Sequence, residues 1–179
     1  MFYRETIFIT GFPGFIASRL VETLVGSETQ FYLLVQPQFV EQAKQEIEHI
    51  AELTDVPLDC FVLVEGDITQ PNLGISDEDL ETIHFETTDV YHFAAAYDLA
   101  VSKQAAYDVN LDGTKNVNNF AASVKHLRRY NYISTCYVAG KREGVILEND
   151  LEHNAGFRNF YEETKYLAEI EVEKLKRPR

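Results

Sequence analysis

The fold of this chain is decided by the stretch Thr6-Ile7-Phe8-Ile9-Thr10-Gly11-Phe12-Pro13-Gly14-Phe15-Ile16-Ala17. A β-branched run ending at Gly11 predicts a strand, and the apolar spacing that follows predicts a helix over residues 15–25. Gly11 allows the sharp turn, Gly14 lets a backbone approach a diphosphate, and Ala17 lets the helix pack closely on the strand. Exposed amides and the helix dipole would then meet the phosphates of a dinucleotide. We predict cofactor contacts from Thr10, Gly11, Phe12, Pro13, Gly14, Phe15 and Ile16.

The rest of the chain alternates apolar strands with amphipathic helices. Further strands are predicted at residues 31–35, 60–64, 89–93 and 130–134, and helices after Pro37, at 77–83, at 105–127 and from Tyr161 almost to the end. This alternation is typical of a parallel sheet covered on both faces. We therefore predict an α/β fold, a Rossmann-type doubly wound parallel sheet with strand order 3-2-1-4-5. Because such sheets usually continue, we expect residues 1–179 to be the N-terminal, dinucleotide-binding portion of a longer enzyme, without its C-terminal substrate-binding part.

Composition excludes several classes of protein. The formal net charge of −13 argues against a nucleic-acid-binding surface and against a polybasic membrane patch. No run approaches the ~18 apolar residues of a membrane-spanning helix, and the N-terminus lacks the apolar region of a signal peptide. Cys60 and Cys136 have neither metal-type spacing nor a disulfide framework. We expect a cytoplasmic protein in which Cys136 is a small packed side chain and His92 a core histidine; a homo-oligomer is compatible with the sequence.

Tyr161 and Lys165 are the candidate acid–base pair. Four residues apart on a helix, a phenol and an ammonium share one face. A neighbouring cation favours the phenolate, so the phenol can exchange protons with a reacting carbonyl or alcohol. The spacing also occurs at Tyr137 and Lys141, but there Gly140 interrupts any helix. The helix-forming context therefore selects Tyr161 and Lys165.

Gln36 follows the second predicted strand, and the residue at this place usually determines the preference for NAD or NADP. An acidic residue at this place binds the ribose 2′-hydroxyl of NAD, and a basic residue accommodates the 2′-phosphate of NADP. The chain has Val35-Gln36-Pro37-Gln38, which contains neither. These residues leave the choice between NAD and NADP open.

Seven motifs occur in order along essentially the whole chain. They are Thr10-Gly11-x-x-Gly14-Phe15, residues 65–69 (EGDIT), 73–80 (LGISDEDL), 91–96 (YHFAAA), 109–114 (VNLDGT), 134–138 (STCYV) and Tyr161-x-x-x-Lys165. With these motifs the chain resembles the extended short-chain dehydrogenase/reductase superfamily, which is NAD(P)-dependent and epimerase/dehydratase-like. It is most similar to the branch of fatty acyl-CoA reductases and thioester reductase domains, the male-sterility-type group.

The resemblance implies roles for further residues. Asp67 and Ile68 would border the adenine, and the middle of the cofactor would be lined by Ala94, Ala95 and Ala96. Asn110 would position the active site, and Thr135 would hydrogen-bond the substrate oxygen. Tyr161 would be the acid/base, and Lys165 would bind the nicotinamide ribose and lower the tyrosine pKa.

Two departures from the branch accompany these roles. Phe93 stands where many relatives have Asn, and Gln36 replaces the Arg frequent in NADP-using members.

The resemblance and the residues together lead to one expected function. We expect an NAD(P)-dependent oxidoreductase that reduces a carbonyl or acyl-thioester by hydride transfer, with NADP favoured over NAD by branch membership. A nucleotide-sugar epimerase or dehydratase using NAD is the alternative among enzymes. A non-catalytic dinucleotide-binding sensor domain is the alternative of another class, although such a domain has no need to retain Thr135, Tyr161 and Lys165.

Overall fold

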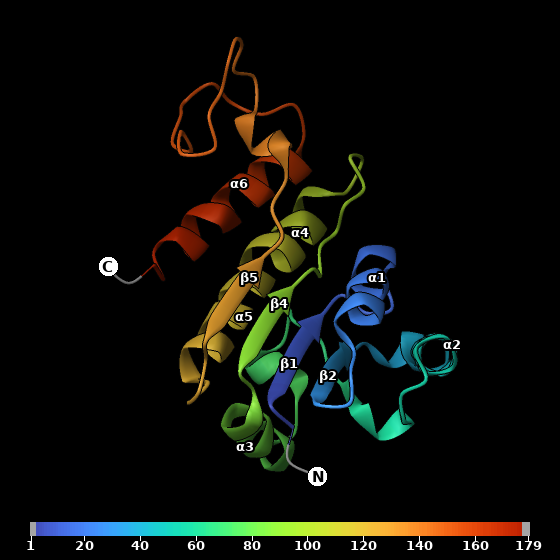
Figure 1. Ribbon diagram of the computed structural model, residues 1–179. Helices are drawn as coiled ribbons and strands as arrows, with labels where there is room; N and C mark the ends of the chain where they lie inside the picture. The colour runs from blue at the N-terminus through green and yellow to red at the C-terminus, as the bar shows by residue number, and fades with distance from the viewer. Residues whose placement is uncertain (1–2, 177–179) are drawn as a thin grey trace.

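The computed structural model describes residues 3–176, which form a five-stranded parallel sheet between two layers of helices (Figure 1). The strand order is β3-β2-β1-β4-β5, which confirms the prediction. Every neighbouring pair is parallel. The strands are β1 (Glu5–Thr10), β2 (Thr29–Val35), β3 (Phe61–Glu65), β4 (Asp89–His92) and β5 (Arg129–Tyr132).

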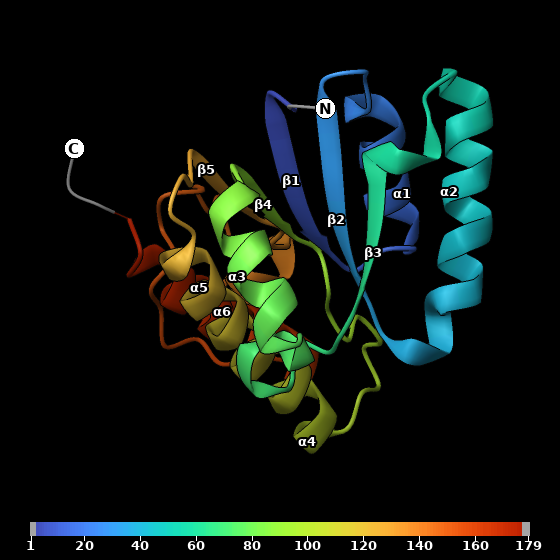
Figure 2. The ribbon, with the colours of Figure 1, turned by 90° about the horizontal axis from the view of Figure 1, so that it is seen from below.

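The two faces of the sheet are covered by different helices, as Figure 2 shows. One face carries α1 (Phe15–Leu24) and α2 (Val40–Thr54), and the other carries α3 (Asp77–Glu86), α5 (Gly113–Ser123) and α6 (Phe160–Glu173). The central strand β1 supplies both cores, since successive side chains of a strand point to opposite faces. Ile7 and Ile9 belong to the core under α1 and α2, whereas Phe8 belongs to the core under α3 and α5. Burial on both faces explains the consecutive apolar residues Ile7, Phe8 and Ile9 at the centre of β1.

The predicted helix over residues 105–127 is real but irregular. It begins as α4 (Lys103–Ala106), passes through a π-helical turn at Tyr107–Asp112 (η4), and continues as α5 to Ser123. A π-helical turn inside an α-helix is uncommon and is frequent at functional sites. Short 3₁₀ turns connect other elements: η1 (Pro37–Phe39), η2 (Leu58–Cys60), η3 (Pro71–Gly74) and η5 (Cys136–Ala139).

Several element boundaries differ from the predictions. Helix α1 ends at Leu24, one residue before the predicted end, and Val25 is its extended C-cap. Strand β5 ends at Tyr132, and the residues that follow it, 133–135, line the cleft described below. Helix α3 runs three residues beyond the predicted 77–83, and Ser76 caps its start, its hydroxyl accepting a hydrogen bond from Asp79 N at 3.2 Å.

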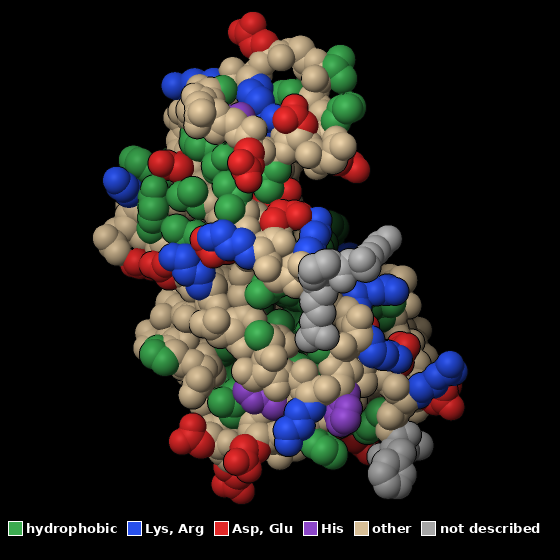
Figure 3. All heavy atoms as spheres, turned by 90° about the vertical axis from the view of Figure 1, so that its left-hand side faces the viewer, with side chains coloured by type: hydrophobic (Ala, Val, Ile, Leu, Met, Phe, Trp, Pro, Cys, Tyr) green, Lys and Arg blue, Asp and Glu red, His purple; other side chains and the backbone are tan. Residues whose placement is uncertain are grey.

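The surface mixes charges of both signs. Figure 3 shows acidic and basic side chains interspersed on the face that carries α6 and β5. Within residues 3–176, no helix has the length and apolar character needed to cross a membrane.

Candidate active site

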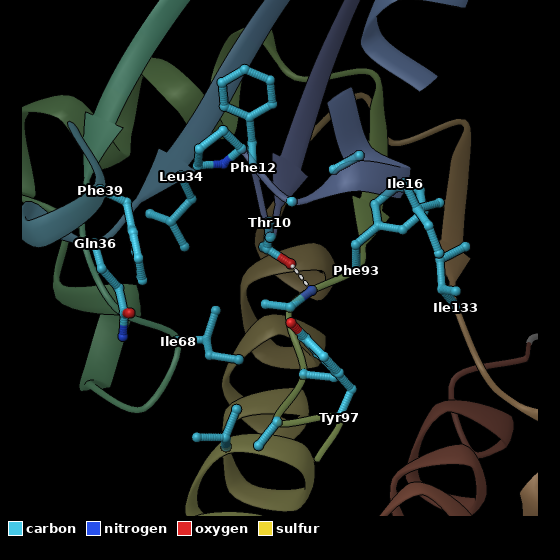
Figure 4. Close-up of a pocket in the computed structure, with 18 of the residues that line it drawn as sticks. Thr10, Phe12, Ile16, Leu34, Gln36, Phe39, Ile68, Phe93, Tyr97 and Ile133 are labelled. Atoms are coloured by element: carbon cyan, nitrogen blue, oxygen red, sulfur yellow. Dashed lines mark hydrogen bonds between the residues drawn. The ribbon is translucent and has the colours of Figure 1, made fainter. Parts of the chain in front are cut away.

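A cleft of about 920 Å³ lies at the carboxyl ends of the five strands (Figure 4). Its walls come from the β1–α1 loop, from the residues that follow β2, β3, β4 and β5, and from α6. In an open parallel sheet this edge, beside the point where strand order reverses, is where ligands bind. The predicted site residues all line this cleft except Asn110, which is buried behind it.

The glycines of the β1–α1 loop sit where larger residues do not fit. Gly11 has φ of +89°, and a Cβ there would lie 2.7 Å from Ala94 N. A Cβ on Gly14 would lie 2.6 Å from Gly11 O, to which Gly14 N donates a hydrogen bond at 2.8 Å. Helix α1 then starts without a side-chain cap and without an acidic residue in its first turn. Its first amides are therefore open to an anion, as a bound diphosphate requires.

His92, at the end of β4, joins this loop to the helix behind the cleft. Its Nδ1 lies 2.7 Å from Thr10 Oγ1 and its Nε2 lies 3.0 Å from Thr114 Oγ1. Thr114 donates its hydroxyl proton to Asn110 O at 2.6 Å, so it must accept from His92 Nε2–H. Thr10 then donates to Nδ1, and it accepts from Ala94 N at 3.2 Å. Burial, with a smaller effect of a nearby lysine, lowers the pKa of His92 to about 3 and keeps it neutral. The prediction of a core histidine is confirmed.

Asn110 continues this hydrogen-bond network toward the predicted acid–base helix. Its Oδ1 accepts from Ala96 N at 2.8 Å, and its Nδ2 donates to Ala96 O at 3.1 Å. The same Nδ2 lies 3.1 Å from Thr164 Oγ1, a residue of α6 between Tyr161 and Lys165. The π-helical turn that contains Asn110 therefore ties the chain after β4 to α6, and Asn110 reaches the cleft only through these neighbours.

Lys165 is buried, with 4% of its surface exposed, at the end of the cleft nearest β5. Its Nζ donates to Ile133 O at 2.7 Å and lies 4.2 Å from the centre of the Tyr132 ring. Burial lowers the pKa of Lys165 to about 8, although Glu169 acts in the opposite direction. This amine is therefore charged at neutral pH but closer to deprotonation than an ordinary lysine.

Tyr161 and Thr135 line the same end of the cleft and are both half-buried. Helix α6 places Tyr161 one turn before Lys165, with Asn159 capping the helix by accepting from Glu162 N at 2.9 Å. Thr135 caps η5, its hydroxyl accepting from Tyr137 N at 3.3 Å.

The rival pair is not arranged in this way. Tyr137 lies in the short turn η5, and Gly140, with φ of +61°, separates it from Lys141. Cys136 is exposed, so the prediction of a packed side chain was wrong. Cys136 begins the 3₁₀ turn η5, outside strand β5, and its side chain is exposed there.

The opposite end of the cleft is lined by Gln36, Asp67 and Ile68. Gln36 Nε2 donates to Asp67 Oδ2 at 2.7 Å, so the residues after β2 and β3 are joined. Phe39 and Tyr97 also line the cleft, and sequence reasoning missed both. Aromatic residues in loops carry no local signal of this kind, because only the folded sheet brings them to one edge.

Comparison with known proteins gives a family match, related sequences and solved structures of similar fold. The NAD-binding domain family described as male sterility protein matches residues 9–178. A putative fatty acyl-CoA reductase of Drosophila melanogaster is 27% identical over 156 residues, which cover 82% of this chain and 29% of that protein. The chain thus spans less than a third of the length of this curated relative.

Two solved structures have the same architecture at low sequence identity. The terminal R domain from the myxalamid PKS-NRPS biosynthetic pathway has a TM-score of 0.80 at 24% identity, covering 95% of this chain and 45% of that chain. The Bordetella bronchiseptica enzyme WbmG in complex with NAD has a TM-score of 0.72 at 20% identity, covering 94% and 49%. The resemblance to the extended short-chain dehydrogenase/reductase superfamily and its male-sterility-type branch is confirmed. The chain belongs to the male sterility protein family of NAD-binding domains.

Proposed function

We propose that this chain is the cofactor-binding part of an NAD(P)-dependent reductase that acts on a carbonyl or acyl-thioester. One observation carries the proposal: a single cleft holds the glycine loop at one place and Thr135, Tyr161 and Lys165 at another. The family match and the similarity to a putative fatty acyl-CoA reductase support the same function.

The residues of the cleft fit a dinucleotide. The open amides at the start of α1 would hold the diphosphate, and the small residues Ala94, Ala95 and Ala96 would leave room beside it. Lys165 would bind the nicotinamide ribose from the far end. A bound nicotinamide supplies the hydride, so the protein has to supply placement and a proton.

Tyr161 would supply that proton to the substrate oxygen. Negative charge grows on this oxygen as the carbonyl is reduced, and preorganised donors stabilise it. The Thr135 hydroxyl is a second donor in the same part of the cleft. Lys165, with a pKa of about 8, can return a proton to Tyr161 near neutral pH.

The test measures oxidation of NADH and NADPH by the protein with an acyl-CoA thioester and with a long-chain aldehyde. Tyr161→Phe is expected to lower kcat by at least about 100-fold, the usual effect of removing a general acid. Tyr137→Phe is the matched control, because it belongs to the other Tyr-x-x-x-Lys match and does not line the cleft. Equal activity of both variants would refute the role of Tyr161.

Two other outcomes would replace the proposal. Conversion of a nucleotide sugar with co-purified NAD would point to an epimerase. Dinucleotide binding without turnover on any carbonyl substrate would point to a sensor domain.

A further inference from the structure

We propose that Glu169 is a positioning residue of the reductase site, which fixes the chain that carries Thr135 and supplies the counter-charge of Lys165. The inference rests on the proposed function, because it takes Thr135 and Lys165 as parts of that site. Glu169 is not among the described residues that line the cleft, so it would act only through its neighbours.

Helix α6 carries three of the residues involved on one side. Tyr161, Lys165 and Glu169 follow one another at four-residue spacing, so their side chains lie along the same face of the helix. In Figure 1 this helix lies beside the chain that leaves β5. Lys165 and Glu169 both bond to that chain, which places this face of α6 against it.

The two side chains hold consecutive residues after β5. Lys165 Nζ donates to Ile133 O at 2.7 Å, and the Ser134 hydroxyl donates to Glu169 Oε2. The next residue is Thr135, the second proposed donor to the substrate oxygen. Two bonds from one helix to two successive residues restrict the position of the residue that follows, as a precise site requires. Glu169 therefore helps to fix Thr135 relative to α6.

Glu169 also differs in charge from the other titratable groups around the Lys165 amine. These groups are the Tyr132 ring of β5, whose centre is 4.2 Å from Nζ, the buried neutral His92 of β4, and the Tyr161 phenol one helical turn away. Of these four groups only Glu169 is a carboxylate. It is therefore the group that can balance the charge of the buried amine.

The carboxylate favours the protonated form of Lys165. Burial lowers the pKa of Lys165 to about 8, and Glu169 opposes this effect, so removing its charge would lower the pKa further. Two unit charges about 6 Å apart change a pKa by about half a unit even at the dielectric constant of water, and by more in a buried site. Glu169 thus keeps Lys165 charged at neutral pH, the form that can return a proton to Tyr161.

The pH profile of kcat tests this role, with the acyl-CoA thioester or the long-chain aldehyde as substrate. The unmodified protein should lose activity on the alkaline side as Lys165 loses its proton. Glu169→Gln keeps an acceptor for the Ser134 hydroxyl and removes the charge, so this loss should move at least about half a unit toward lower pH. Ser134→Ala removes the hydrogen bond and keeps the charge, so kcat should fall about fivefold without a shift of the profile.

Glu173→Gln is the matched control for the charge. Glu173 is an exposed carboxylate of the same helix, and it pairs with Lys176. Its replacement should change neither kcat nor the pH profile.

A second measurement does not depend on turnover. In protein labelled with ¹³C at the lysine Cε atoms, the chemical shift of each Cε follows the protonation of its amine, and the signal of Lys165 is the one that Lys165→Met lacks. The pKa obtained from this signal should fall by at least about half a unit in Glu169→Gln. It should stay unchanged in Glu173→Gln.

The outcomes separate the inference from the proposed function. An unchanged Lys165 pKa in Glu169→Gln, or a lower kcat without a shifted profile, would overturn the role of Glu169 as counter-charge. An unchanged kcat in Ser134→Ala would overturn the role of the bond between Ser134 and Glu169. A protein that turns over no carbonyl substrate would refute the proposed function, and the ¹³C titration would still decide whether Glu169 is the counter-charge.

Discussion

Replacing Lys165 by methionine should change stability in a way that depends on pH. The side chain is buried, and its Nζ contacts the Ile133 carbonyl and the Tyr132 ring. Burial lowers its pKa to about 8, against 10.5 for an ordinary lysine. The native state therefore binds this proton less tightly than the unfolded chain does. Folding with the amine charged costs about 1.4 kcal/mol for each pKa unit of difference, or about 3 kcal/mol.

The sign of the pH dependence follows from linkage. Below about pH 8 the amine is charged in both states, and the whole cost is present. As the pH rises from about 8 to 10.5, the native state loses the proton first, so the unfolding free energy increases. Above 10.5 the cost is gone. Methionine has a similar length and no charge, so it lacks this dependence.

The size of the effect at pH 7 also includes contacts that methionine cannot make. Losing the hydrogen bond to Ile133 costs about 1–2 kcal/mol. Losing the contact with the Tyr132 ring costs about 1–2 kcal/mol when desolvated. At pH 7 these losses offset most of the gain, and Lys165→Met should be close to the original protein in stability. Between pH 7 and pH 10.5 the unfolding free energy of the original protein should rise by about 3 kcal/mol, whereas that of the variant should not. The difference in stability between the two proteins should therefore change by about 3 kcal/mol in favour of the original.

Urea unfolding of both proteins at several pH values from 7 to 10.5 measures this change. Lys141→Met is the matched control, since Lys141 is exposed and its replacement removes a charge already in water. A difference between Lys165→Met and the original protein that stays constant to within about 1 kcal/mol across the range would refute the reasoning, because it would mean that Lys165 is not desolvated.

Three further experiments, two with substitutions and one with a thiol reagent, test other parts of the structure. His92→Phe removes two buried hydrogen bonds and should lower the unfolding free energy in urea by about 2–4 kcal/mol; an unchanged midpoint would show that the network adds nothing. Gly14→Ala places a Cβ 2.6 Å from a loop carbonyl and should abolish dinucleotide binding in calorimetry, whereas Gly26→Ala meets open space and should not. Ellman's reagent should react rapidly with exposed Cys136 and with buried Cys60 only after denaturation, so two fast thiols in the native protein would contradict the fold.

The fold was largely predictable because its signals are local. Strand runs such as residues 31–35 and helix periodicity in α1 and α6 each depend on a short window of sequence. The ends of elements were less predictable, since they depend on what the chain meets in space. The predicted strand at 130–134 ends early for this reason, and the helix after residue 105 contains a π-helical turn that no apolar pattern indicates.

The parts of the candidate site that are local sequence motifs could be predicted. The side-chain contacts between residues far apart in the sequence could not. The glycine loop and the Tyr161–Lys165 pair have recognisable spacing, and the structure places them in one cleft. The link between Thr10 and His92 joins residues 82 positions apart, so no local pattern contains it. The bond between Gln36 and Asp67 likewise exists only after β2 and β3 have paired.

The central claim is that one cleft orients a dinucleotide from the β1–α1 loop toward Tyr161 and Lys165. A crystal structure of the protein with NAD bound tests this claim most directly. The expected structure has the diphosphate on the amides at the start of α1 and the nicotinamide ribose beside Lys165. A dinucleotide bound outside this cleft, or bound with its adenine beside Tyr161, would contradict the claim.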